Sequence, residues 1–525
     1  MTDTTTAPAQ TPSSGTDPDA GADRPTRRTG IVIVGSGFSG LGAAIRLRGE
    51  GITDFLVLER GQDVGGTWRD NTYPGAACDV PSQLYSFSFD LNPDWSRSFS
   101  TQPEIQAYLH KVARKHDVVD QHVFGCEVES ATWDAEAQEW VLETSRGRFV
   151  APIAVSAVGA LCEPSLPDVP GLADFPGAIF HTARWNHDED LTGKRVAVIG
   201  TGASAIQVVP ELAGTAAHLD VYQRTAPWIL PRSDRPYHRL EQLAYRTVPG
   251  LQRLVRAAIY GIRETQVMGL AKNQGFMLPL RLAGKRHIAA AIKDPELRRK
   301  VTPNFEVGCK RILISNGWYP AIARDDVELV TDGIAEVRGS AVVTKDGTER
   351  EVDAIVVATG FHVTDSPTFE TFYGAKGRSL ADKWRETGME AYKGLTVDEF
   401  PNMFFLVGPN TGLGHTSMVY MIESQINYLV DAVKTMRAKG LATVELKEQE
   451  RVDYNTELAR KMAETVWMNG GCASWYKDHR GRNTTLWPDF TFRFREITKH
   501  FDLEAYESTT VGAGTAARST KETVA

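Results

Sequence analysis

Two segments of the chain have glycines at a spacing that lets backbone amides approach a pyrophosphate group. In the first segment, an apolar run is followed by Gly35, Gly37 and Gly40, then by a helix-forming stretch and a second apolar run that ends at Glu59. These glycines suit a tight turn, a close approach to phosphate and close helix–strand packing, and the carboxylate can accept hydrogen bonds from a ribose 2′-hydroxyl. The pattern therefore predicts a strand, turn, helix and strand that bind a dinucleotide with a free ribose.

The second segment repeats this spacing with Gly200, Gly202 and Ala205, but its second apolar run ends at Arg224. A carboxylate at that point would repel a 2′-phosphate, whereas a guanidinium can pair with it through charge-assisted hydrogen bonds. The two segments together predict one cofactor with a free ribose and one with a phosphorylated ribose, which indicates FAD and NADPH.

The elements that position these residues divide into two nested domains. Residues 30–160 are predicted to form the first part of an FAD-binding domain, and residues 356–507 its second part, because an apolar run before a glycine turn marks the return of the chain. Residues 187–355 are predicted to form an NADP-binding domain, reached through a linker at 161–186. The predicted fold class is α/β, with two nested doubly wound, Rossmann-like domains.

Residues 237–301 have helical periodicity and many arginines and lysines, which predicts a helical insertion in the second domain. A helix lying on a membrane surface is an alternative, but the solvated faces of ordinary helices are the favoured interpretation. The polar segments 1–29 and 508–525 are predicted to be disordered tails.

The overall composition restricts the partners of the protein. A formal charge of −8 argues against nucleic acid. No apolar run approaches the roughly 18 residues of a membrane span, and residues 1–29 lack the apolar segment of a signal peptide, so we expect a cytoplasmic enzyme that is not an integral membrane protein. The sequence does not indicate an oligomeric state.

The five cysteines are odd in number, and no two of them form a C-x-x-C motif. This spacing predicts no redox-active dithiol, no zinc site and no disulfide framework, as suits a reducing compartment. The cysteines are Cys78, Cys126, Cys162, Cys309 and Cys472.

Two further motifs resemble those of a known family. The segment FPGAIFHTARWN, residues 175–186, resembles the F-x-G-x-x-x-H-x-x-x-W signature of type I Baeyer–Villiger monooxygenases, in the flavin-containing monooxygenase superfamily. Asn186 departs from the Pro or Asp that usually follows the tryptophan. The segment GGTWRDNTYPGAACD, residues 65–79, resembles a second family signature and implies flavin contacts by Gly66, Thr67, Trp68 and Asp79. The residues that match the first signature are Phe175, Gly177, His181 and Trp185.

The resemblance implies a catalytic arginine at Arg311, in a Lys-Arg pair. Reduced flavin and dioxygen form a flavin-peroxide, which must stay deprotonated to attack a carbonyl and must be protected from decay. A guanidinium suits this task because its pKa, above about 12, keeps it charged when desolvated. The resemblance places Asp79 near the flavin, and pairing with Arg311 would compensate for the burial of its charge.

The resemblance also implies the surroundings of the second cofactor. Lys310 is expected to join Arg224 and Thr225 on the 2′-phosphate of NADPH. Trp475 lies in a segment that resembles the mobile C-terminal loop of the family, where an indole supplies an apolar wall and an N–H donor. His181 is expected to hold a hydrogen-bond network between the domains rather than to act as an acid or base.

The activity implied by the resemblance is the insertion of one oxygen atom from dioxygen next to the carbonyl of a ketone, giving an ester or lactone. A first alternative is an oxygenase that attacks nitrogen or sulfur with a protonated hydroperoxide. A second, less favoured alternative is an NADPH oxidase that makes hydrogen peroxide without an organic substrate. The sequence does not identify the ketone.

Overall fold

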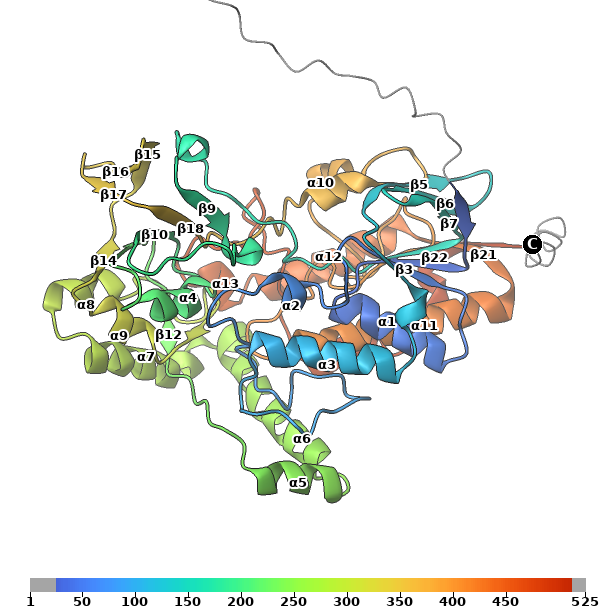
Figure 1. Cartoon of the computed structure of the whole chain (residues 1–525). Coiled ribbons are helices and arrows are strands. Elements are labelled where there is room, and N and C mark those ends of the chain that lie inside the picture. Colours follow the sequence, from blue (N-terminus) through green and yellow to red (C-terminus); the bar gives the residue numbers. More distant parts are fainter. Residues whose placement is uncertain (1–24, 512–525) are drawn as a thin grey trace, which may run out of the picture.

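Two five-stranded parallel sheets form the centre of the protein (Figure 1). The computed structural model describes residues 25–511. The first sheet has the order β20-β8-β2-β3-β4, and α1 (Phe38–Gly49) follows its first glycine turn. Its strands are β2 (Ile31–Val34), β3 (Leu56–Glu59), β4 (His122–Phe124), β8 (Ile153–Ser156) and β20 (Met403–Phe405).

The first sheet is buried on both faces, which explains why its strands are continuous apolar runs. Ile33 belongs to the core formed with α1, α3 (Gln102–Lys115) and α11 (Met418–Lys439). Val32, its neighbour in β2, belongs to the core on the opposite face, with Trp140 of a third, mixed sheet. Successive side chains of a strand point to opposite faces, so one short strand contributes to two cores.

The second parallel sheet has the order β14-β11-β10-β18-β9, and α4 (Ala205–Leu212) follows its glycine turn. The α/β fold class with two Rossmann-like domains is thereby confirmed. The strands are β9 (Ala178–His181), β10 (Arg195–Ile199), β11 (His218–Tyr222), β14 (Val327–Val330) and β18 (Ala354–Val357).

The order of the strands in the first sheet reveals the nesting. After β8 the chain leaves this sheet, builds the second sheet, and returns to pair β20 with β8 in parallel. The strand β9 lies within the segment predicted as a linker, and β18 crosses the predicted boundary at residue 355. The exact domain boundaries remain a prediction.

A third sheet has the order β1-β7-β6-β5-β19 and packs against the first. It contains β5 (Val128–Asp134), β6 (Glu139–Thr144), β7 (Gly147–Ala151) and β19 (Phe372–Tyr373). Its first strand, β1 (Thr26–Arg28), lies within the predicted tail 1–29 and pairs with β7. At the other end of the chain, β22 (Tyr506–Thr510) pairs with β21 (Leu441–Leu446) and enters the predicted tail 508–525. The predicted tails were therefore wrong for the residues next to the folded domains, because backbone pairing to an edge strand does not require an apolar sequence. The rest of both tails, residues 1–24 and 512–525, lies outside the described residues.

The segment predicted as a helical insertion forms α5 (Arg239–Thr247), α6 (Leu251–Glu264), α7 (Leu278–Ala291) and α8 (Pro295–Val301). Figure 1 shows α5 and α6 projecting below the sheets. The exposed side of α6 carries the apolar Leu254 and Ile262 beside Arg253, so it is not a purely charged face. Among residues 25–511, no helix has the length and apolarity needed to cross a membrane.

A separate three-stranded antiparallel sheet is formed by β15 (Ile334–Arg338), β16 (Ala341–Thr344) and β17 (Glu349–Glu351). The remaining α-helices are α2 (Thr67–Asp70), α9 (Trp318–Ile322), α10 (Leu380–Thr387), α12 (Glu448–Met462), α13 (Val466–Asn469) and α14 (Thr491–Ile497).

Candidate functional site

A cavity of about 520 Å³ lies at the carboxyl ends of β2 and β3. Ligands bind at this edge in open parallel sheets, and the volume is typical of a ligand site. The cavity brings together residues from three predicted groups: the first glycine segment, the 65–79 signature and the C-terminal loop. Among its lining residues are Gly35, Gly37, Glu59, Gly66, Thr67, Trp68, Arg311 and Trp475.

The first glycine turn fits a pyrophosphate. Gly35 has a φ of +102°, which L side chains rarely adopt. A Cβ on Gly40 would lie 1.8 Å from the carbonyl oxygen of Gly35, so α1 touches the turn directly. Beside Gly37 the nearest atom to such a Cβ would be 3.8 Å away, on Gly66, which leaves the backbone open to the cavity. These observations agree with the role predicted for each glycine.

Glu59, at the end of β3, is only 4% exposed. Its carboxylate accepts hydrogen bonds from the backbone N–H groups of Ser36 (2.8 Å) and Gly61 (2.7 Å). It also forms an ion pair with Arg69 at 2.7 Å. The charge of Glu59 is thus fixed and partly compensated at the wall of the cavity. The sequence analysis missed Arg69, although its place inside the 65–79 signature was a usable signal.

The second glycine turn has the same backbone geometry. Gly200 has a φ of +113°, and a Cβ there would lie 2.5 Å from the carbonyl oxygen of Ala358, much as one on Gly35 would lie 2.7 Å from that of Ala157. Ala205 begins α4. Around Gly202 a Cβ would meet no atom within 4 Å, so its backbone is open. This turn can therefore also approach a phosphate.

Two cations lie close to each other beyond the second turn. Arg224 is exposed, and Lys310 and Thr225 are half-buried. The pKa of Lys310 is lowered from its ordinary value, first by burial and then by the positive charge of Arg224. Within residues 25–511, neither cation forms an ion pair of 4.0 Å or less with a carboxylate. Two uncompensated cations at this point are suited to bind an anion such as a phosphate.

Arg311 and Asp79 form a bidentate ion pair. Arg311 Nε donates to Asp79 Oδ2 at 3.0 Å, and Nη2 donates to Oδ1 at 2.7 Å and to Oδ2 at 2.6 Å. Asp79 raises the pKa of Arg311 above its ordinary value, so the guanidinium remains charged. The Arg311 side chain is 38% exposed and lines the cavity, whereas Asp79 holds it from behind. The predicted pairing is present.

The Lys-Arg pair joins the two halves of the site. The positive charge of Arg224, near the second glycine turn, acts on Lys310, while the next residue, Arg311, lines the cavity at the first glycine turn. The two predicted cofactor sites are therefore adjacent at this pair of residues.

Two aromatic residues of the C-terminal loop reach the cavity. Trp475 is 46% exposed, and Tyr476, which the sequence analysis missed, is 1% exposed. Their ring centroids are 4.4 Å apart, and both residues line the cavity together with Arg311. Burial raises the pKa of Tyr476, so its hydroxyl stays neutral. The adjacent Trp-Tyr pair in the sequence was a signal that could have identified it.

The four matched residues of the 175–186 signature do not line the cavity, although Arg184 of the same segment does. His181 is 4% exposed, and its Nδ1 accepts a hydrogen bond from the backbone N–H of Ala183 at 3.1 Å. Burial lowers the pKa of His181 to about 4, which keeps the imidazole neutral. Trp185 packs edge-on against Phe180. The unusual Asn186 accepts a hydrogen bond from the N–H of Asp188 at 3.1 Å, so it caps a local turn.

The prediction that the chain has no disulfide was wrong. Cys309 and Cys472 form a disulfide with a Cα–Cα distance of 6.1 Å. The two residues are separated by 163 positions, so spacing alone could not pair them. With a disulfide present, the cysteines no longer indicate a reducing compartment. The remaining cysteines, Cys78, Cys126 and Cys162, are free.

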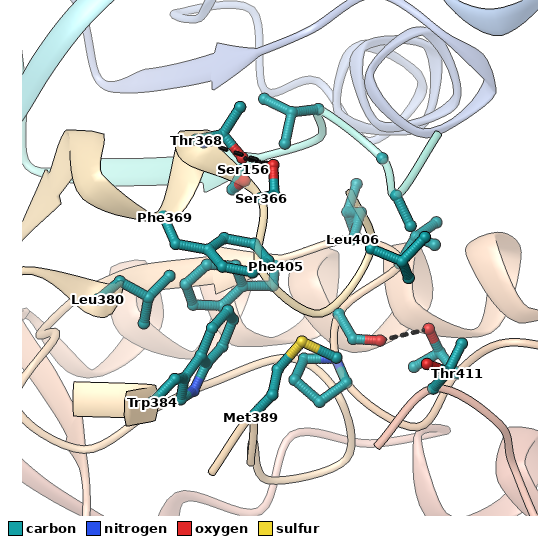
Figure 2. Close-up of a pocket in the computed structure, with 18 of the residues that line it drawn as sticks. Ser156, Ser366, Thr368, Phe369, Leu380, Trp384, Met389, Phe405, Leu406 and Thr411 are labelled. Carbon is teal, nitrogen blue, oxygen red and sulfur yellow. Dashed lines mark hydrogen bonds between the residues drawn. The ribbon is translucent and has the colours of Figure 1, made fainter. Parts of the chain in front are cut away.

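A second, apolar cavity of about 70 Å³ adjoins the first and shares Val158 and Val407 with it. Figure 2 shows Phe369, Phe405 and Trp384 along one wall, and the ring of Trp384 contacts both of the others. Its volume is too small for a dinucleotide or for a typical organic ligand. We therefore place the cofactor and the substrate in the larger cavity.

Comparison with known proteins agrees with this geometry. A family profile described as pyridine nucleotide-disulphide oxidoreductase matches residues 32–275. A Baeyer-Villiger monooxygenase from Streptomyces coelicolor is 51% identical over 91% of this chain and 92% of its own length. The chain belongs to the Baeyer–Villiger monooxygenase family. The cysteines of the disulfide fall outside the profile match, so that match does not indicate a dithiol reductase.

Solved structures of Baeyer–Villiger monooxygenase type share the whole architecture. Cyclohexanone monooxygenase from Rhodococcus sp. Phi1, bound to NADP+, is 28% identical, with a TM-score of 0.81 over 93% of this chain and all of that one. OTEMO in complex with FAD and NADP is 25% identical, with a TM-score of 0.81 over 92% of this chain and 99% of that one. This Baeyer–Villiger monooxygenase is an FAD- and NADPH-dependent flavoprotein that uses dioxygen and a small-molecule substrate.

Proposed function

We propose that this monooxygenase inserts oxygen next to the carbonyl of a ketone, giving an ester or lactone, with Arg311 as the catalytic residue. The main support for this proposal is the bidentate ion pair between Asp79 and Arg311, whose side chain lines the larger cavity. When bound, FAD and NADPH supply the electrons and the activation of dioxygen.

The role of Arg311 follows from its fixed charge. A guanidinium that points toward the negatively charged oxygen of the reacting species would stabilise that charge. It would also keep this oxygen deprotonated. By analogy with oxyanion-hole donors, such a contact contributes roughly 3–4 kcal/mol to the transition state. Asp79 is a positioning residue, since its two oxygens fix the plane of the guanidinium.

The remaining residues hold the cofactors and exclude water. Trp475 and Tyr476 form the apolar wall beside Arg311, where exclusion of water strengthens electrostatic contacts. Arg224, Thr225 and Lys310 are assigned to the 2′-phosphate of NADPH. The residues assigned to FAD are Gly35, Gly37, Gly40, Glu59, Gly66, Thr67, Trp68 and Asp79, and those assigned to the pyrophosphate of NADPH are Gly200, Gly202 and Ala205.

Cyclic ketones are the first substrates to test, because the structural relative named above is a cyclohexanone monooxygenase. Oxygenation of sulfur or nitrogen is the second candidate activity, so the panel includes sulfides and amines. A cytoplasmic location is part of the proposal, since NADPH is a metabolite of the cell interior.

The test replaces Arg311 and follows two reactions separately. Arg311→Ala should still bleach the flavin absorbance when NADPH is added without oxygen, but ester or lactone formation should fall several hundred-fold, which corresponds to roughly 3–4 kcal/mol. Arg338→Ala, at an exposed hairpin arginine, is the matched control and should keep wild-type rates. Ester formation by Arg311→Ala at near wild-type rate would show that the role given to Arg311 is wrong.

A further inference from the structure

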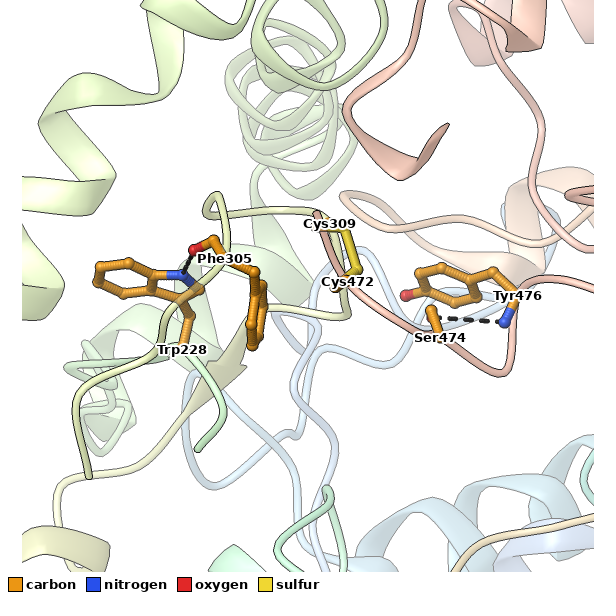
Figure 3. Close-up of a disulfide and its surroundings, with 6 residues drawn as sticks. All are labelled: Trp228, Phe305, Cys309, Cys472, Ser474 and Tyr476. Carbon is orange, nitrogen blue, oxygen red and sulfur yellow. Dashed lines mark hydrogen bonds between the residues drawn. A yellow bond between two sulfur atoms is a disulfide. The ribbon is translucent and has the colours of Figure 1, made fainter. Parts of the chain in front are cut away.

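The disulfide connects the two segments that carry the reaction site. Cys309 directly precedes Lys310 and Arg311, and Cys472 lies three residues before Trp475. Figure 3 shows the sulfur–sulfur bond between Phe305 and Trp228 on one side and Tyr476 on the other. The bond therefore joins the loop of the catalytic arginine to the loop that forms the aromatic wall of the cavity.

The hydrogen bonds of segment 471–477 stay within the segment, apart from an isolated β-bridge between Lys477 and Asn483, and the segment is also anchored by Tyr476, which is buried in the apolar cluster that contains Cys309. Before it, the carbonyl oxygen of Gly470 accepts a hydrogen bond from Glu306 N–H at 3.0 Å. After it, Trp487 N–H donates to Gly412 O at 2.9 Å. Within it, Tyr476 N–H donates to Ser474 Oγ at 3.3 Å, a contact that stays inside the segment. The disulfide is thus the covalent tie of this segment to the rest of the site.

The surroundings of the two sulfurs differ, and this decides where a reductant can attack. Cys309 is fully buried in an apolar cluster with Trp467 and Tyr476, whereas Cys472 is half-buried at the edge of that cluster. An incoming thiolate can therefore reach the sulfur of Cys472 more readily than that of Cys309. In a cell interior rich in thiols, disulfides are usually transient or redox-sensing rather than structural.

We propose that Cys309–Cys472 is a thiol-exchangeable latch, a redox modification site that fixes segment 471–477 over Arg311. The reduced form keeps both cofactors but has a looser aromatic wall, so more of the NADPH consumed yields hydrogen peroxide instead of oxygenated product. The functional part of this inference rests on the role proposed above for Arg311 and Trp475. The existence of the latch does not depend on it.

The exchange is balanced as follows. A thiolate attacks Cys472 Sγ, the bond between the two cysteine sulfurs breaks, and Cys309 leaves as a thiolate that takes up a proton. A second thiol then releases Cys472, so two thiols become one disulfide and the protein gains two S–H groups. Hydrogen peroxide reverses the change: it is reduced to two waters as the two cysteines lose two electrons and two protons.

The first measurement counts thiols and does not involve activity. The protein is equilibrated with mixtures of oxidised and reduced dithiothreitol, then denatured and alkylated. Its mass is measured by mass spectrometry to count the alkylated cysteines. The oxidised limit should show three alkylated cysteines, matching the three free cysteines, and the reduced limit should show all five. Five alkylated cysteines in every mixture would overturn the proposal.

The second measurement probes the segment itself. Trypsin cleavage after Lys477 and Arg480 should accelerate at least tenfold on reduction of the wild type, while the flavin content stays constant. The variant Cys472→Ser should be cleaved at the fast rate with or without dithiothreitol, which controls for effects of the reagent elsewhere. Equal cleavage of the oxidised and reduced wild type would also overturn the latch.

The third measurement connects the latch to turnover. Reduced wild type and Cys472→Ser should release at least threefold more hydrogen peroxide per NADPH than the oxidised wild type. An unchanged ratio, with thiol counts and cleavage as expected, would refute the functional part of the proposal. If no ketone is oxygenated in any redox state, the proposed function fails, while the first two measurements still decide on the latch.

Discussion

The two glycine turns have nearly the same backbone conformation, but the charged residues at the ends of the strands that follow them differ in sign and in burial. In each turn, a glycine with positive φ lies against a carbonyl oxygen of the neighbouring strand segment, that of Ala157 or Ala358. Glu59, at the end of the first strand pair, is buried and paired with Arg69. Arg224, at the end of the second, is exposed, and its positive charge helps to lower the pKa of Lys310. Under the proposed assignment, the shared backbone would bind a pyrophosphate in both turns, and the strand-end residue would select the ribose.

The difference in burial also separates a resident cofactor from an exchanging one. A carboxylate whose hydrogen bonds are already made within the protein is preorganised, so little ordering remains when the flavin binds. The exposed Arg224 and the half-buried Lys310, which lies over the ring of Phe305, repel each other and have no carboxylate partner within residues 25–511. Under the proposed assignment, we expect the first site to keep its cofactor bound and the second to bind and release its cofactor during turnover.

The packing of the two turns gives the prediction with the largest effect. Gly40→Ala would place a Cβ 1.8 Å from a carbonyl oxygen, whereas Gly202→Ala meets no atom within 4 Å. Gly40→Ala should lose bound flavin and destabilise the protein by roughly 3 kcal/mol, as overpacking does. Gly202→Ala is the matched control, and its thermal midpoint should match the wild type. Flavin absorbance and thermal unfolding check both, and equal stability of the two variants would contradict the asymmetry.

A smaller effect is expected from the charge at the second strand end. Arg224→Ala should raise the KM for NADPH more than tenfold, about 1.4 kcal/mol or more, because a charge-assisted contact to the 2′-phosphate is lost. The KM for NADH, which lacks that phosphate, should change little. Steady-state kinetics with both nucleotides provide the check. An equal rise for both would mean that Arg224 does not distinguish them.

The smallest effect is expected from Lys310 and depends on pH. Lys310→Ala should raise the KM for NADPH about fivefold, roughly 1 kcal/mol for a half-exposed ion pair. Because the pKa of Lys310 is lowered, the wild-type side chain loses its charge at a lower pH than an ordinary lysine does. The KM for NADPH should accordingly rise as the pH increases toward 10, and Lys310→Arg should abolish this rise. A pH profile identical in wild type and Lys310→Arg would exclude the assignment.

The features of the two turns that depend on short stretches of sequence could be predicted. The glycine spacing, the strand-end charges of Glu59 and Arg224, and the signature that contains Asp79 are all short-range patterns with a fixed geometric meaning. They predicted the two parallel sheets. The pairing of Asp79 with Arg311, 232 positions apart, was predicted from the family resemblance and not from a local pattern.

Long-range features could not be predicted where neither a local pattern nor the family resemblance indicated them. The disulfide joins residues 163 positions apart, and no local pattern records that contact. The strands β1 and β22 have polar sequences and are ordered by backbone pairing with partners far along the chain. Arg69 and Tyr476 stand within motifs that were noticed, but only the fold shows that their side chains turn toward the cavity.

The late return of the chain to its first sheet has a consequence for biosynthesis. On the ribosome, β2, β3 and β8 are made early, but their neighbour β20 emerges only after the complete second sheet has been synthesised. Until then, the open side of β8 presents unpaired backbone groups on an apolar strand. The edge of β8 therefore stays without its partner strand while some 250 further residues are translated. We expect FAD to bind only after β20 has been synthesised and has paired with β8.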